Sequence, residues 1–321
     1  IIGNSVTSIG INVFYQCTSL TDVSLNSASA NLSNTNFYNY VTSINIPEDT
    51  LQIADYAFFR CSKVTSVIIP DSVISIGNQV FEGCTGLTSA IIGNSVTSIG
   101  INVFYQCTNL TSIIIPDSVE LLGSSAFQNC SSLTDLTIGD GLRVIQISSF
   151  SNCSSLQNIT FGQNINIIDG YAFQNCVSLV ELTFNDYLYQ INDSAFSGCT
   201  NLRRVTFGEF LRYLAGTVFE GCFLLEEANF KGSPPVVDTN PFQSSPTTVY
   251  TDTNATGWGG NFSYRPVFRK TLIITPPAGS SALLDIYSST DLSTWTLMES
   301  IEVVNPPEQI FMKAVLTPPS E

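Results

Sequence analysis

Cysteine recurs at a fixed interval along most of this 321-residue chain. Eight of its nine cysteines are 23 residues apart, and the ninth, Cys17, lies 44 residues before the first of them. A repeat of this length predicts a solenoid, in which similar coils stack and each buries its apolar side chains against the next. The series is Cys61, Cys84, Cys107, Cys130, Cys153, Cys176, Cys199 and Cys222.

Other apolar positions keep the same phase, as the coil around Cys61 illustrates. Phe58 lies three residues before the cysteine and Val64 three residues after it, and both positions are apolar in every such coil. Val67 and Ile69 follow, alternating with polar or outward residues, and alternation with period two predicts a strand with one buried face. A Pro or Gly then starts a turn in most coils.

The remainder of each coil must return to the start of the next. A second apolar pair, such as Val73 and Ile76, marks this return side. We expect the segment before each cysteine, such as Ala57–Cys61, to close the coil as a short helical turn.

The unit from Ile69 to Ser89 reads Ile-Pro-Asp-Ser-Val-x-x-Ile-Gly-x-x-Val-Phe-x-x-Cys-x-x-Leu-Thr-Ser. It resembles the BspA-like, treponemal-type leucine-rich repeat family, found in bacterial surface proteins and in some protists. The resemblance implies a curved right-handed solenoid with a parallel sheet along one face. It also implies no shared catalytic residues.

The period divides the chain into three predicted parts. Residues 1–231 form the leucine-rich-repeat solenoid of about ten coils, with a degenerate coil near residues 26–45. Residues 232–270 form a cap, because the last coil would otherwise expose an apolar face and an unpaired strand. Trp258 is predicted to pack there. Residues 271–321 read as four short strands in a small β-module, so the predicted fold class is a β-rich solenoid with these two additions.

The cysteine series permits disulfides, a metal site or reduced thiols. Side chains stacked on successive coils point in parallel rather than toward each other, which disfavours disulfides, and thiolates in a row cannot surround one metal ion. We therefore predict a structural ladder of buried, reduced thiols with no metal and no cofactor. Without a provided partner for a hydroxyl, Cys130→Ser would destabilise the fold by roughly 1 to 3 kcal/mol.

A series of acids and amides follows the first strand of most coils. Oxygen ligands of this kind permit a calcium-binding ladder. Turn chemistry explains them better, because the series mixes amides with acids and lacks a second set of ligands. The residues are Asp71, Asn94, Asp117, Asp140, Gln163, Asp186 and Glu209.

The candidate binding residues are Ile68, Ile91 and Ile114, seven residues after successive cysteines. The alternation places them on the outer side of the sheet, where a contiguous apolar patch marks an interaction site. Two alternatives remain open: β-branched residues suit any sheet surface, or the irregular segment 26–40 folds over them.

Charged residues are expected to pair across neighbouring strands further along the same face. Arg203 and Arg204 lie one repeat from Glu181 on one side and from Glu226 and Glu227 on the other. This pairing accounts for the charges without a ligand.

The composition of the chain excludes several classes of function. The net charge of −15 and eleven Lys and Arg disfavour a nucleic-acid partner, and the absence of His excludes triads that need imidazole. No transmembrane segment is recognisable, and we expect a signal peptide upstream of Ile1. The favoured function is a non-enzymatic, extracellular or cell-surface binding or adhesion protein whose solenoid face contacts a protein or glycan. The alternative is a structural assembly subunit of a surface layer, filament or virion appendage, which self-associates through the uncapped end or the C-terminal β-module.

Overall fold

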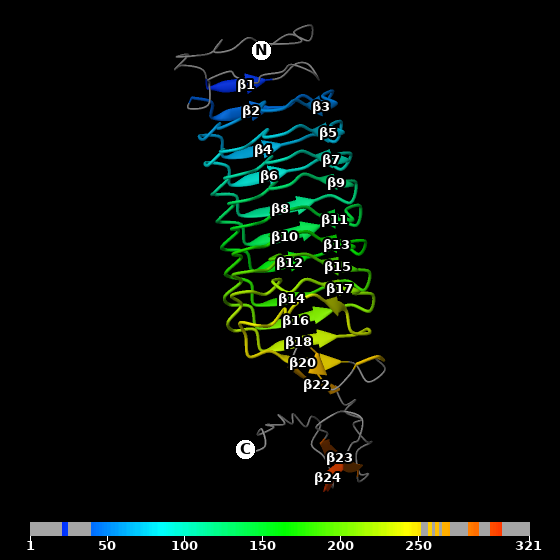
Figure 1. Cartoon of the computed structure of the whole chain (residues 1–321). Helices are drawn as coiled ribbons and strands as arrows, with labels where there is room; N and C mark the ends of the chain where they lie inside the picture. Colours follow the sequence, from blue (N-terminus) through cyan, green and yellow to red (C-terminus); the bar gives the residue numbers. More distant parts are fainter. Residues whose placement is uncertain are drawn as a thin grey trace.

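The computed structural model describes residues 21–24, 40–251, 256–258, 261–262, 265–269, 282–288 and 296–303. Most of these residues form a parallel-strand β-solenoid of about nine turns, and none of the described residues is helical (Figure 1). The predicted solenoid fold is therefore confirmed. Cys17, most of the degenerate coil and the segment 26–39 lie outside the described residues.

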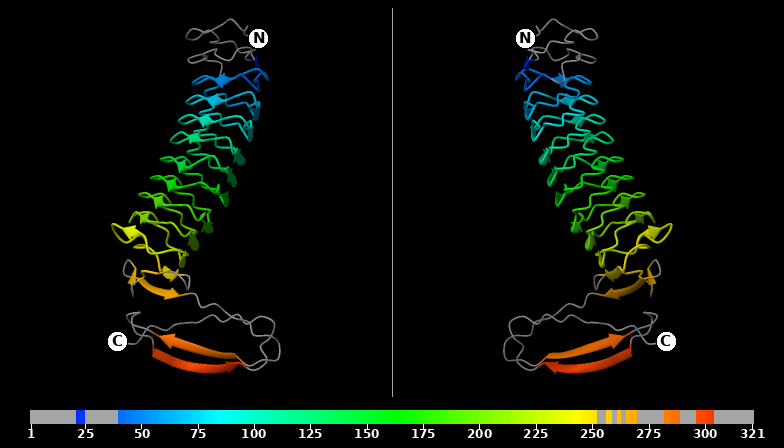
Figure 2. Two further views of the ribbon diagram at one scale, coloured as in Figure 1. Left: turned by 90° about the vertical axis from the view of Figure 1, so that its right-hand side faces the viewer. Right: turned by 90° about the vertical axis from the view of Figure 1, so that its left-hand side faces the viewer.

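Each coil contributes one strand to a front row and one shorter strand to a return row (Figures 1 and 2). The front row consists of β1 (Asp22–Ser24), β2 (Ser43–Asn45), β4 (Ser66–Ile68), β6 (Ser89–Ile91), β8 (Ser112–Ile115), β10 (Asp135–Ile138), β12 (Asn158–Thr160), β14 (Glu181–Thr183), β16 (Arg204–Phe207), β18 (Glu227–Phe230) and β20 (Thr248–Thr251). The return row consists of β3 (Gln52–Ile53), β5 (Ser75–Ile76), β7 (Ser98–Ile99), β9 (Leu121–Leu122), β11 (Val144–Ile145), β13 (Ile167–Ile168), β15 (Gln190–Ile191), β17 (Tyr213–Leu214) and β19 (Val236–Val237).

Neighbouring strands of a row pair in parallel with a register of one repeat. Ile68 lies opposite Ile91, and Ile76 opposite Ile99. Hydrogen bonding divides the front row between β2 and β4 and again between β12 and β14, and it divides the return row between β9 and β11. From β4 to β18 the register equals the 23-residue repeat, so each sequence position of these coils forms a column along the stack. At the two ends, β1 with β2 and β18 with β20, the shift is 21 residues.

The last described strands depart from the repeat. β22 (Arg265–Arg269) pairs in parallel with β20, and β21 (Asn261–Phe262) pairs antiparallel with β22 at the edge of the sheet. Trp258 packs on Phe230 with ring centroids 4.9 Å apart and donates its indole N–H to the Gly232 carbonyl. The predicted position of Trp258 is confirmed.

Two strands of the predicted C-terminal β-module are described. β23 (Ala282–Ser288) and β24 (Thr296–Val303) form an antiparallel hairpin. The other two predicted strands, near residues 272–275 and 311–316, lie outside the described residues.

The core is made of the columns that the repeat predicts. Phenylalanines three residues before the cysteines are fully buried and stack in one ladder, with centroid distances between 5.0 and 5.8 Å. In the later coils a second phenylalanine ladder lies beside the first. Its members are Phe161, Phe184, Phe207 and Phe230, at the position that is isoleucine in the earlier coils.

The segment that closes each coil is not the predicted helical turn. In the coil around Cys61 the N–H groups of Tyr56, Phe58 and Arg60 donate to carbonyls of the next coil, at 2.7 to 2.9 Å. The alternate N–H groups of Ala57, Phe59 and Cys61 donate three residues back within the coil. Tyr56 and Arg60 have positive φ angles of 60° and 57°. A helix would use every N–H internally, whereas this arrangement gives alternate donors to the stack.

Candidate functional site

The isoleucine face consists of Ile68, Ile91 and Ile114 on β4, β6 and β8. Their side chains are 63 %, 56 % and 65 % exposed, while the residues beside them in each strand are buried. The three strands are adjacent, because β6 pairs with both β4 and β8. The structure therefore brings the three predicted binding residues together on the outer side of the front row.

The three strands of the isoleucine face carry no charge, and the nearest charge in the next strand is Asp135, opposite Ser112. β4, β6 and β8 contain Ser, Val, Ala and Ile, and no charged residue. In the same column, exposed Asn45 precedes Ile68 and exposed Thr137 follows Ile114. The apolar stripe is thus three coils long and polar at both ends. The segment 26–40, which the sequence offers as a possible cover, lies outside the described residues except for Tyr40.

The later part of the front row carries the predicted charge pairs. Arg204 contacts Glu181 on one neighbouring strand and Glu227 on the other, each at 2.8 Å. Arg203 lies 3.4 Å from Glu226. The predicted cross-strand pairing is confirmed. These charged side chains therefore interact with one another across the sheet.

The eight described cysteines are free thiols and buried. Each thiol from Cys84 onward donates to the carbonyl of a phenylalanine in the preceding coil, as Cys130 does to Phe104 at 3.2 Å. The expectation that this position offers a hydroxyl no partner is therefore wrong. The sequence could not reveal the acceptor, because it is a main-chain oxygen of another coil.

Burial controls the chemistry of these thiols. It raises the pKa of Cys84 and of Cys153 to about 12, since a buried thiolate loses its hydration. Thiols of this kind stay protonated at neutral pH and are poor nucleophiles. The thiol ladder is accordingly part of the core rather than a reactive site.

The column of acids and amides stabilises the stack. Asp71 Oδ1 accepts the main-chain N–H of Asn94 at 2.7 Å, and Asp140 Oδ1 accepts that of Gln163 at 2.7 Å. The side chains of these turns therefore accept hydrogen bonds from the main chain of the next coil. In the described part of the chain, no group of three or more acids, cysteines or histidines could hold a metal ion.

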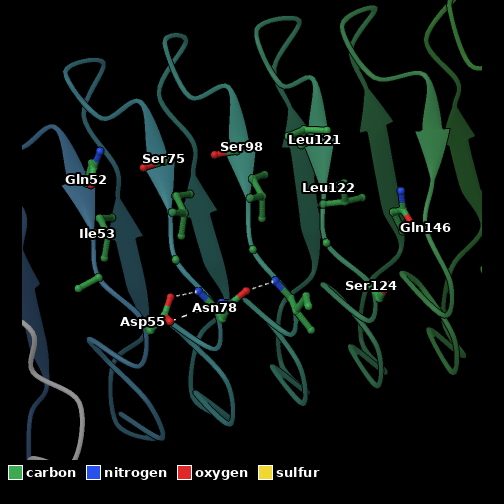
Figure 3. A pocket seen from close by; sticks show the side chains of 17 residues that line it. Gln52, Ile53, Asp55, Ser75, Asn78, Ser98, Leu121, Leu122, Ser124 and Gln146 are labelled. Carbon is green, nitrogen blue, oxygen red and sulfur yellow. Dashed lines mark hydrogen bonds between the residues drawn. The ribbon is translucent and has the colours of Figure 1, made fainter.

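A shallow groove of about 610 Å³ runs along the return row from β3 to β9 (Figure 3). The residues that line it include Gly77, Gly100, Asp55, Asn78 and Ser98. Asp55 Oδ1 accepts the main-chain N–H of Asn78, which lies in the next coil (Figure 3). This groove was not predicted from the sequence, although three glycines at one repeat position, Gly77, Gly100 and Gly123, indicate it.

Packing explains why glycines line this groove. A Cβ atom on Gly100 would lie 2.5 Å from the carbonyl oxygen of Gly77, closer than real contacts allow. Glycine is required here because two main chains approach each other. The groove thus follows from the stacking of these coils.

The family model of the BspA-type leucine-rich repeat region matches residues 1–63, 32–146 and 120–248 of this chain, in six copies. A crystal structure of a leucine-rich repeat protein from Bacteroides ovatus is 25 % identical, covers 78 % of this chain and 71 % of that chain, and has a TM-score of 0.58. No curated protein matches.

Two further solved structures are similar at lower TM-scores. The leucine-rich repeat protein of T. pallidum is 24 % identical over 62 % of this chain and 78 % of that chain, with a TM-score of 0.42. A leucine-rich cell surface protein from Faecalibacterium prausnitzii is 24 % identical over 71 % of this chain and 77 % of that chain, with a TM-score of 0.34.

No helix among the described residues is long and apolar enough to cross a bilayer. The family model spans most of the chain, and its repeat corresponds to the stacked coils described above. The chain belongs to the BspA-type leucine-rich repeat family.

Proposed function

We propose that this protein is a non-enzymatic binding protein of the cell surface or extracellular space, and that it binds a protein partner through the isoleucine face. The observation that carries the proposal is the row of Ile68, Ile91 and Ile114, each more than half exposed on adjacent strands. Isolated exposed apolar residues are ordinary, but an aligned apolar row is a feature of interaction sites.

The fold itself does not need isoleucine at these positions. The same column contains Thr137, Thr160, Thr183 and Thr206 in the following coils, and those strands have the same register. Threonine retains the β-branch that suits a strand and adds a hydroxyl that suits water. The apolar side chains are therefore available for contact rather than needed for folding.

The chemistry of the face defines the partner. Three isoleucines in contact would contribute roughly 1.5 to 3 kcal/mol each from removal of apolar surface from water. The neutral strands around them provide no charge for recognising an ionic ligand. A partner surface with a matching uncharged apolar strip is the class that fits.

The test uses Ile68→Thr, Ile91→Thr and Ile114→Thr together. Binding to a panel of purified serum and extracellular-matrix proteins is measured by surface plasmon resonance, beside a control with Thr137→Ala, Thr160→Ala and Thr183→Ala. We expect the isoleucine variant to lose binding that the control retains, at an unchanged melting temperature. A much lower melting temperature would instead mean that the face is covered within the monomer.

Self-association through the same face is the second candidate function. The chain has a net charge of −15, so two copies repel each other over most surfaces, whereas the isoleucine face is neutral. Two sheets pack well face to face when both present apolar side chains. Sedimentation equilibrium separates the two functions: a dimer that the isoleucine variant abolishes supports assembly, and a monomeric wild-type chain supports binding of another protein.

A further inference from the structure

Two coils near the end of the solenoid have aromatic side chains at a turn where the other coils have small ones. Tyr187 and Phe210 lie between the front and return rows, and are 59 % and 45 % exposed. The fold accepts Ser, Gly or Asn at this place, so packing does not require the rings. The corresponding residues of the five preceding coils are Ser72, Ser95, Ser118, Gly141 and Asn164.

The two rings lie side by side. Their centroids are 6.0 Å apart and their planes differ by 22°. Tyr189, two residues after Tyr187, is 48 % exposed. We call these three residues the aromatic ridge. Exposed rings gathered in one place are a feature of binding surfaces, because they offer a large contact area with little side-chain entropy to lose.

A pocket of about 240 Å³ begins at the residue before the ridge. Its lining is mostly polar, from Gln163, Thr183, Asn185, Asp186 and Lys231, together with Phe161 and Phe184. Lys231 Nζ contacts Asp186 at 3.0 Å across the intervening coil, where Gly208 occupies the same column as Asn185 and has no side chain. The pocket is thus built from side chains of three different coils.

One group in this pocket lacks a partner. Asn185 donates its side-chain N–H to the Gly162 carbonyl at 2.7 Å, but its Oδ1 atom is buried and accepts no hydrogen bond within the described part of the chain. A buried carbonyl oxygen of this kind favours a ligand that can donate to it. The fold does not require the amide, because six other coils have Pro or Gly at this position and the coil of β18 has Lys231: the six are Pro70, Gly93, Pro116, Gly139, Gly162 and Gly208.

We propose that the aromatic ridge and the adjacent pocket bind a neutral oligosaccharide. Sugar hydroxyls donate and accept, and so complement the amide oxygen of Asn185, the carboxylate of Asp186 and the ammonium of Lys231. The C–H face of a sugar ring packs on aromatic side chains. The charges of Asp186 and Lys231 already neutralise each other, which favours an uncharged ligand. This site is separate from the isoleucine face and does not depend on its function.

The experiment is affinity electrophoresis in native gels that contain a soluble glucan, mannan, xylan or galactomannan, with alginate as a polyanion. The test variant combines Tyr187→Ser and Phe210→Ser, because Ser72 and Ser118 show that the turn accepts serine. The control is Tyr171→Ser, which removes a 45 % exposed tyrosine at a position that other coils fill with serine.

We expect at least one neutral polysaccharide to retard the wild-type protein and the control equally. The double variant should bind roughly tenfold more weakly or worse, as loss of two ring contacts implies, with an unchanged melting temperature. Asn185→Gly, which restores the residue of neighbouring coils, should weaken binding in the same gels and so implicate the pocket.

Three results would overturn the proposal. They are retardation by none of the neutral polysaccharides, equal retardation of the double variant, and retardation by alginate alone. A change of oligomeric state in the double variant, without polysaccharide binding, would reassign the ridge to a protein contact and would likewise overturn it.

Discussion

The coils of β4, β6 and β8 and the coils of β14, β16 and β18 follow the same path with different surfaces. In the first group the outer side of the front row has isoleucine and serine, and no charge. In the second it has threonine or asparagine beside the paired charges of Glu181, Arg204 and Glu227. Inside, both groups have the same phenylalanine and cysteine columns.

This difference separates what the fold requires from what it permits. Buried positions recur because each coil is packed between two others, and a change there would leave a cavity or a clash. Outward positions vary because only water constrains them. Coil-specific chemistry, such as the isoleucine face and the aromatic ridge, is therefore where function is expected.

Alkaline pH should give the largest effect, because the thiol columns of both groups respond to it. Folding raises the pKa of Cys84 and Cys153 from 9.0 to about 12, so their stabilising contribution is complete below pH 9 and is lost as the pH rises toward 12. Each thiol contributes up to about 1.4 kcal/mol per pH unit in that range. We expect the melting temperature to fall steeply above pH 9, in one transition.

Circular dichroism at several pH values measures this effect. A variant with Cys107→Ala and Cys130→Ala should lose stability less steeply, since two titrating groups are gone. Two separate transitions would contradict the shared interior, because one group of coils would then unfold before the other.

The phenylalanine ladder should give the next largest effect. Phe127 stacks on Phe104 and Phe150 at 5.0 and 5.3 Å and is fully buried. Phe127→Ala should cost about 3 to 5 kcal/mol, and Phe196→Ala, in the charged group of coils, about the same. Thr137→Ala on the outer side should cost well under about 1 kcal/mol. Urea unfolding tests all three, and equal costs for Phe127 and Thr137 would invert the assignment of inner and outer columns.

Replacement of one thiol by a hydroxyl should destabilise the fold less than the sequence alone predicts. The carbonyl of Phe104, 3.2 Å from the sulfur of Cys130, can accept a bond from serine as well. Cys130→Ser should therefore cost about 1 kcal/mol, whereas Cys130→Ala should cost more because it loses both the bond and the sulfur's volume. A serine variant less stable than the alanine variant would mean that the carbonyl is not an effective acceptor.

The smallest expected effect concerns the charged surface. Arg204→Ser gives β16 the residue found in β4, β6 and β8 and leaves Glu181 and Glu227 without this partner. Because these side chains are largely exposed, the cost should be below about 1 kcal/mol and should vanish at high salt. Thermal melts at low and high ionic strength decide this, and a salt-independent loss would point to packing instead.

The repeat predicts the fold well because buried columns reflect a packing requirement that every coil shares. It does not predict the closing segment around Phe58, where local sequence resembles a helical turn but carbonyls of the next coil compete for the N–H groups. It also hides the acceptor of the Cys130 thiol, which lies 26 residues away on the main chain.

The candidate sites also differ in how far the sequence alone predicts them. Ile68, Ile91 and Ile114 could be placed from alternation alone, since a strand turns every second side chain outward. The pocket near Asn185 could not, because Lys231 reaches it across an intervening coil. An alignment of the repeats would have exposed Tyr187 and Phe210 as departures, but only the structure shows that their rings are neighbours.

The uniform register has a consequence for how such a chain changes in length. Residues 1–18 have the same sequence as residues 91–108, which indicates duplication of repeat sequence within one gene. An inserted coil meets the same neighbours above and below, and extends the stack by about 4.8 Å without disturbing any column. The number of coils therefore sets the length of the stack.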